Sequence, residues 1–116
     1  MDNHLRVNIA YIAARRIRGG GGSSAFDYAR GVHKTISGSV TKNSVAIFDH
    51  ERGAHISGSC SSLYDYSLGG HVSLNVRGNH FSGFDYRSGH HFSGNVSGNS
   101  VTVFDYGVGQ HFHYST

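Results

Sequence analysis

The chain of 116 residues has no proline, no tryptophan and a single cysteine, and only 15% of its residues are charged. One cysteine excludes an internal disulfide. The scarcity of charge leaves a surface that is compatible with self-association, so a homo-oligomer is expected. Nothing in this composition points to a cofactor, and none is predicted.

Long apolar runs are also missing. The apolar stretch from Val7 to Ala14 is too short to span a bilayer, and Arg15 and Arg16 follow it without a convincing cleavage site. No membrane partner is therefore expected, and a soluble cytoplasmic protein is the default prediction.

What the chain does have is one motif, repeated five times. Each copy begins with an aromatic residue and then Asp, and the next residue is Tyr or His. Two free positions, Gly, one free position and His complete the motif. Such a dense repeat predicts one supersecondary unit used several times. The aromatic residues that open the five copies are Phe26, Phe48, Tyr64, Phe84 and Phe104.

The segments between the motifs predict hairpin turns. Gly98-Asn99 and Gly78-Asn79 lie between alternating apolar residues, where Gly and Asn accept positive φ readily. A turn at Gly98-Asn99 pairs Val96 with Val101 and Phe92 with Asp105. A four-residue loop over 87–90 would pair Tyr86 with His91 and yields the same two faces. Length differences between copies are even, as an antiparallel meander requires.

The predicted fold is therefore all-β, with or without one short N-terminal helix. Hairpins of about twenty residues form an antiparallel meander that makes a sandwich or a barrel-like sheet. Residues 1–116 are one domain, and the five-copy repeat covers 25–116. A β-solenoid is the alternative, although it would stack the repeated aspartates, which repel one another.

The segment 1–19 lies outside the repeat and is ambiguous. Leu5, Val7 and Ile9 alternate as in a strand, whereas Leu5, Ile9 and Ile12 recur at helical spacing. Either element could close one side of the sheet, and helix is marginally favoured. In the repeat, Cys60 occupies a position that holds valine in other copies, which predicts a small buried side chain rather than a reactive thiol.

The repeated polar and aromatic residues are the candidate binding residues. One face of the meander has the composition of a core, and the other is aromatic but polar, so a second layer or a partner could cover it. Each repeat His lies on the face opposite its Asp. The candidates on the aromatic face are Tyr28, Tyr66, Tyr86, Tyr106, His55, His71, His91 and His111. A structural ladder of hydrogen-bonded Tyr and His is the simpler interpretation of this face.

The other candidates form a row of aspartates at the strand ends, namely Asp49, Asp65, Asp85 and Asp105. Asp before a turn commonly accepts hydrogen bonds from backbone N–H groups, and this role is the preferred interpretation.

Three functions follow from these residues. The favoured one is a non-catalytic binding module whose repeated Tyr, His and Asp residues contact a glycan or a protein. The first alternative is a histidine-rich metal-binding protein, since His and Asp are good ligands for Zn, Ni or Cu. The second is a nucleic-acid adaptor acting through Arg15, Arg16 and Arg18, because residues 1–42 hold seven basic residues and two acidic ones. Nucleic acid is not the expected partner, because a solvated arginine face explains this charge more simply. Repetition of the polar residues also argues against an asymmetric catalytic site.

Overall fold

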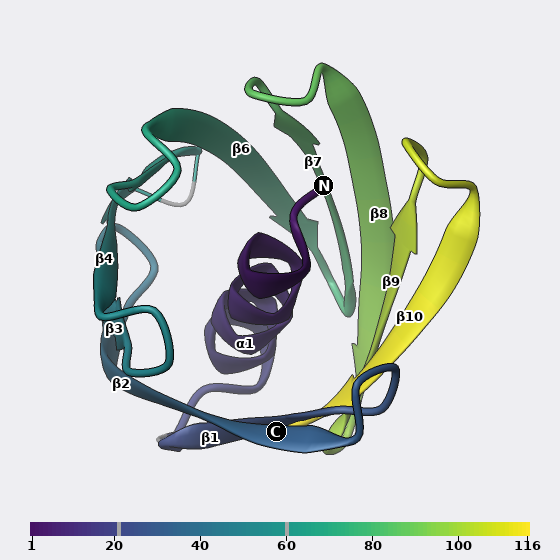
Figure 1. Cartoon of the computed structure of the whole chain (residues 1–116). Helices are drawn as coiled ribbons and strands as arrows, with labels where there is room; N and C mark the ends of the chain where they lie inside the picture. The colour runs from purple at the N-terminus through teal and green to yellow at the C-terminus, as the bar shows by residue number, and fades with distance from the viewer. Residues whose placement is uncertain (21, 60) are drawn as a thin grey trace.

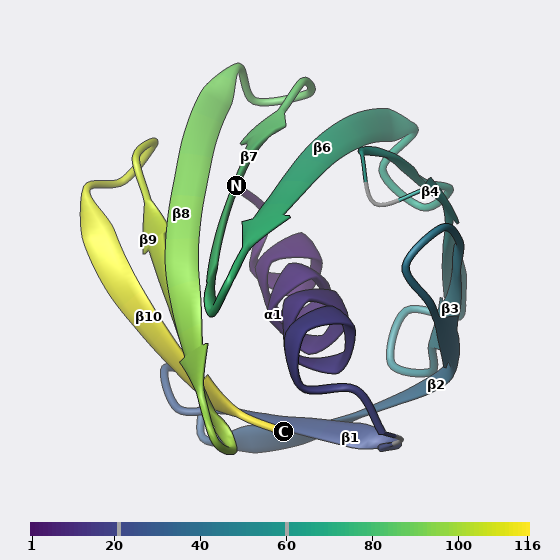
Figure 2. The same ribbon diagram turned by 180° about the vertical axis from the view of Figure 1, so that it is seen from behind.

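The computed structural model describes residues 1–20, 22–59 and 61–116, and these form one helix surrounded by ten strands. Consecutive strands pair antiparallel, and β1 also pairs with β10, so the meander closes into a barrel (Figure 1). The view from behind shows the same continuous wall around the helix (Figure 2). The predicted all-β, barrel-like meander is confirmed, and the alternative β-solenoid is wrong because every strand pair is antiparallel.

The elements follow the chain in a simple order. Their bounds are α1 (Asn3–Arg18), β1 (Ser24–Asp27), β2 (Val32–Val40), β3 (Val45–Asp49), β4 (Ala54–Ser59), β5 (Ser62–Asp65), β6 (Gly70–Arg77), β7 (His80–Asp85), β8 (His90–Ser97), β9 (Ser100–Asp105) and β10 (Gln110–Ser115).

Helix α1 begins and ends at strong local signals. The Asp2 carboxylate accepts hydrogen bonds from the N–H groups of His4 and Leu5, which have no partner within the helix. Gly19, at φ 75°, ends the helix, and three arginines in its last turn complement the negative end of the helix dipole. These signals explain why helix prevails over the equally visible strand pattern.

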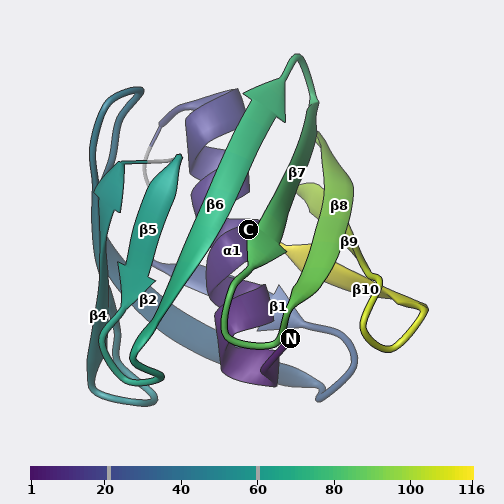
Figure 3. The ribbon, with the colours of Figure 1, turned by 90° about the horizontal axis from the view of Figure 1, so that it is seen from above.

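The helix lies inside the barrel rather than against one side of an open sheet. Figure 3 shows α1 enclosed by the strands when the barrel is seen from above. The helix contacts β1, β2, β6, β8 and β9, and every residue from Leu5 to Ala14 is buried. Ala10, Ala13 and Ala14 are all fully buried, and their small side chains let surrounding strands approach the helix. The core is thus the space between α1 and the inner face of the barrel.

The predicted hairpin register holds at one end of the barrel. Val96 pairs with Val101 and Phe92 with Asp105 around the turn at Gly98-Asn99, as predicted. At the other end the predicted loop is displaced. His90 pairs with Asp85, so the loop covers 86–89 rather than 87–90, and the register differs from the prediction by two residues. A two-residue shift keeps each side chain on its face, which is why the predicted faces remain correct.

Two glycines permit a close approach between neighbouring strands and aromatic rings. A Cβ atom at Gly94 would overlap the Thr102 carbonyl oxygen and lie 2.6 Å from the Phe81 ring, while one at Gly83 would overlap the Ser73 carbonyl oxygen and the Phe92 ring. Phe81 pairs directly with Gly94, and Phe92 with Gly83, so each aromatic side chain covers the space its glycine leaves. Large and small residues therefore alternate across these strands.

Two further sequence predictions concern a membrane-spanning helix and Cys60. Among the described residues, no helix combines the length and apolar character that a membrane span requires. Cys60 lies outside the described residues, so the prediction of a small buried side chain there stays a prediction.

Candidate binding surface

The repeated Asp and Gly build the loops at one end of the barrel. In each copy the Asp Oδ1 atom accepts a hydrogen bond from the N–H group two residues later, as Asp85 does from Arg87 at 3.1 Å. In the β7–β8 loop the N–H of Gly89 also donates to the Asp85 carbonyl oxygen at 2.8 Å, and Gly89 has a φ of 76°. The predicted turn role of the aspartates is thereby confirmed, and the spacing from Asp to Gly is the length of this loop.

The five aspartates, Asp27, Asp49, Asp65, Asp85 and Asp105, form a ring of buried carboxylates that we call the aspartate ring. The ring surrounds the first half of α1, because Asn8 donates to Asp49 at 2.8 Å and Arg6 donates to Asp105 at 3.4 Å. None of the five is more than 3% exposed. A ligand at the outer surface therefore cannot reach these carboxylates.

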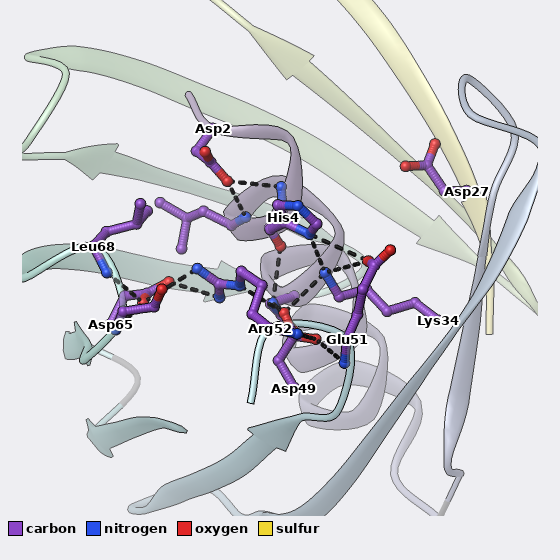
Figure 4. Close-up of polar contacts among 12 residues, drawn as sticks. Asp2, His4, Asp27, Lys34, Asp49, Glu51, Arg52, Asp65 and Leu68 are labelled. Atoms are coloured by element: carbon purple, nitrogen blue, oxygen red, sulfur yellow. Dashed lines mark hydrogen bonds and ion pairs between the residues drawn. The ribbon is translucent and has the colours of Figure 1, made fainter. Parts of the chain in front are cut away.

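One segment of the aspartate ring is a dense ionic cluster (Figure 4). The fully buried Lys34 ammonium lies 2.8 Å from the Asp49 carboxylate, 3.2 Å from Glu51 and 2.7 Å from His4 Nδ1. Arg52 lies between two carboxylates, at 2.8 Å from Asp49 and 2.9 Å from Asp65. The buried charges are compensated by direct partners, as burial requires.

The pKa values in this cluster show how strongly the partners favour the charged forms. Burial alone raises the pKa of Asp49, but hydrogen bonds from Lys34, Arg52 and Asn8 together lower it from 3.8 to about 2. The hydrogen bond from Arg30 is the main reason that the pKa of Glu51 is lowered. Asp49 and Glu51 therefore act as permanent anions at neutral pH.

The cluster was only partly foreseeable from the sequence. Lys34 occurs two residues before Ile36 in β2, and this spacing places it on the inner face. Arg30 and Arg52 each follow an Asp by three residues, a spacing found in the first two copies. Arg6 and Asn8 carry no such signal, because polar residues in an otherwise apolar helix are usually assigned to its exposed face.

The outer face carries five aromatic clusters, one for each copy of the motif. In each cluster a central ring contacts the residue after Asp and the repeat His, with ring centroids 4.6 to 4.8 Å apart in edge-to-face geometry. The predicted ladder of hydrogen-bonded Tyr and His is wrong, because the described residues contain no hydrogen bond between a Tyr and a His side chain. The two side chains instead contact the same central ring. The central rings are Phe26, Phe48, Tyr64, Phe84 and Phe104.

Four tyrosines project from these clusters into solvent. Tyr28, Tyr66, Tyr86 and Tyr106 are between 56% and 64% exposed, although the edge of each ring rests on a partly buried neighbour. In the second copy His50 occupies the same position and lies 2.7 Å from the Ser37 hydroxyl. Exposed large rings therefore recur at equivalent places in four of the five copies.

Three shallow hollows lie beside these tyrosines, at equivalent places around the barrel. One is lined by Tyr106 and His91, with a volume of 420 Å³, and a second is lined by Tyr86 and His71, with a volume of 330 Å³. The third, of 430 Å³, is lined by Tyr28 and includes His111. Each hollow joins the tyrosine of one copy to the repeat histidine of the copy beside it, including across the closure between β1 and β10. We call them the Tyr106, Tyr86 and Tyr28 hollows.

The structure therefore divides the predicted site residues into two sets that do not meet. Asp49, Asp65, Asp85 and Asp105 are buried in the aspartate ring. The outward set keeps the predicted tyrosines and histidines together on one surface, comprising Tyr28, Tyr66, Tyr86, Tyr106, His55, His71, His91 and His111.

The two alternative functions rest on the histidines and on the arginines at the end of α1. Within the described ranges, no three His, Cys, Asp or Glu side chains lie close enough to hold a metal ion together. Arg15 donates to the Gly38 carbonyl oxygen and Arg18 to that of Gly98, each at 2.8 to 2.9 Å, so both arginines tie the end of α1 to the barrel.

Comparison of the chain with protein-family models, with curated proteins and with solved structures finds no match to any of them.

Proposed function

We propose that this protein is a non-catalytic carbohydrate-binding module that holds a glycan at repeated sites on its outer face. The observation that carries the proposal is the recurrence of the hollows. The Tyr106, Tyr86 and Tyr28 hollows combine the same two residue types at equivalent positions and have volumes of 330 to 430 Å³. These volumes fall within the range of small-molecule sites.

The chemistry of the hollows fits a sugar. Tyr86 and His71 line one hollow together with the hydroxyl residues Ser61 and Ser62. Among the described residues, none of the three lining sets contains an Asp, Glu, Lys or Arg. An exposed ring offers a flat apolar surface for the C–H face of a sugar, and neutral hydroxyl and imidazole groups match sugar hydroxyls as donors and acceptors.

Repetition also fits a ligand with many similar units. A single open hollow of this size gives weak binding, but several hollows on one rigid barrel engage a branched or polymeric ligand together. Effective concentration then raises the overall affinity without any new contact. We therefore expect polyvalent glycans to bind far more tightly than the matching free monosaccharide.

A glycan array tests the proposal with the Tyr86→Ala/Tyr106→Ala double variant. We expect the unmodified protein to bind a subset of glycans and the double variant to bind the same glycans roughly tenfold more weakly, because two of the stacking surfaces are gone. Each substitution removes only an edge contact from an exposed ring, so the variant should keep its fold, which circular dichroism checks.

The matched control is Val108→Ala, in the same loop as Tyr106. Val108 is 55% exposed and does not line the three hollows in the described structure. It should leave glycan binding unchanged. Equal binding by the double variant and the unmodified protein would remove the tyrosines from the site, and binding to no glycan at all would refute the proposal.

A further inference from the structure

The Tyr106 hollow differs from the other two because it opens into a larger groove. The groove has a volume of 780 Å³, crosses the outer faces of β6, β7, β8 and β9, and reaches His111 of β10. Ser82 and Ser93 line both the groove and the Tyr106 hollow, so the two depressions adjoin at these residues. We call the larger part the outer groove.

The register of the strands explains the shape of the outer groove. Ser82 pairs with Ser93, and these short side chains leave a low floor at its centre. Nearer the turn at Gly78-Asn79, the next row of outward-facing residues contains Arg77, His80 and Asn95. Arg77 pairs with His80, and His80 pairs with Asn95. Longer polar side chains thus form one wall, while Phe104 and His111 line the opposite end.

The charge of the outer groove has one sign. Arg77, His80 and His111 line it, and no Asp or Glu belongs to the described lining. In the described part of the chain no hydrogen bond or ion pair engages the Arg77 guanidinium, whereas Arg6, Arg30 and Arg52 each have carboxylate partners. A planar guanidinium with all its donors free matches a carboxylate in a bidentate manner.

Resting on the proposed function, we infer that the outer groove binds an acidic sugar unit adjacent to the neutral unit held beside Tyr106. The carboxylate of this unit pairs with Arg77, and the Asn95 and Asn75 amides and the Thr102 hydroxyl bind its hydroxyl groups. The neighbouring unit crosses Ser82 and Ser93 to reach Tyr106. The Tyr86 and Tyr28 hollows have no arginine in their linings and accept neutral units.

Paired glycan arrays test this inference, one native and one whose sugar carboxylates have been methyl-esterified. Esterification removes the charge and leaves the rest of each glycan in place. We expect the unmodified protein to bind one or more acidic glycans roughly 10- to 100-fold more strongly on the native array, the range expected for a charge-assisted pair. The Arg77→Gln variant should bind both arrays equally and keep its binding to neutral glycans.

Arg87→Gln is the matched control, because it makes the same charge change in the loop at the opposite end of β7, outside the outer groove. It should retain the preference for the native array. Equal binding of the unmodified protein to both arrays, with dependence on Tyr86 and Tyr106, would overturn the acidic-sugar inference and leave the proposed function standing. A preference that survives Arg77→Gln would also overturn it, and absence of binding on both arrays would refute both proposals.

Discussion

The five repeated aspartates share one task and differ in a second. Each caps its loop through Oδ1, so each needs an acceptor oxygen at that position. Asp49 additionally compensates the buried charges of Lys34 and Arg52, whereas Asp85 has no ion-pair partner among the described residues. The amide of asparagine can replace the acceptor but not the charge.

This difference predicts unequal losses of stability for one substitution at two equivalent positions. Asp49→Asn should lower the free energy of unfolding by about 3 kcal/mol, because Lys34 and Arg52 lose their shared buried anion and keep only Glu51 and Asp65 as carboxylate partners. Asp85→Asn should cost less than about 1 kcal/mol, because only a capping acceptor is exchanged. Urea denaturation of both variants at pH 7 measures the two costs, and similar values would show that the buried charges are not what Asp49 stabilises.

The pKa of Asp49 also predicts a dependence of stability on pH. Its folded value of about 2 lies below the ordinary 3.8, so the folded state binds fewer protons than the unfolded chain. The resulting stabilisation is complete above pH 4 and is lost as the pH falls from 4 through 2, by about 2 kcal/mol. Urea denaturation across this range should show a smaller loss for Asp49→Asn than for the unmodified protein, and parallel curves would contradict the ion-pair assignment.

At the scale of the elements, glycines within the strands allow neighbouring strands to approach more closely than a Cβ atom would permit. Gly94 faces inward, where a Cβ atom would overlap the Thr102 carbonyl oxygen and crowd the Phe81 ring. Gly94→Ala should therefore destabilise the protein by about 3 kcal/mol, since a backbone atom cannot give way as a flexible side chain does.

The Gly98→Ala variant is a suitable comparison for this prediction. Gly98 has a φ of 58°, but open space surrounds its missing Cβ, so only the backbone conformation opposes alanine, at about 1 kcal/mol. Thermal and urea denaturation of both variants measure the difference. Equal costs would mean that the close approach of β8 to β9 is not what requires glycine at position 94.

The repeat predicted the hairpins well because side chains alternate between the two faces of a strand, so an even or odd separation along the chain determines which face each occupies. Val96 and Val101 lie inward and His91 outward in the structure, as the turn at Gly98-Asn99 required. The predicted loop over 87–90 was wrong because a shift of two residues leaves every side chain on the same face, so the alternation cannot locate the loop. The hydrogen bonds of Asp85 and Gly89 determine that it covers 86–89. The register set by the turn at Gly98-Asn99 also predicted that His91 faces Tyr106, and the Tyr106 N–H does donate to the His91 carbonyl oxygen at 3.1 Å. The hollow between these side chains could not be predicted, because its shape depends on how the rings pack on the outer face.

At the scale of the whole molecule, the position of α1 inside the barrel could not be predicted from the sequence. The alternation and the helical spacing in residues 5–14 both indicate apolar contact, but neither says that contact occurs on every side. Burial all around follows only from closure of the barrel, which depends on the pairing of β1 with β10 across most of the chain. The helix and the wall consequently share a single core, and neither buries its apolar surface without the other.

This shared core predicts that α1 and the barrel unfold together. Native-state hydrogen exchange should give the amides of Ile9, Ile12 and Ala13 the same opening free energy as those of Val101 and Val103, because release of the helix would leave the barrel interior unfilled. Exchange followed by NMR at increasing urea concentration makes the comparison residue by residue. Amides of α1 that open at a clearly lower free energy than the strands would show that the helix can leave a barrel that remains folded, and the single core would then be the wrong description.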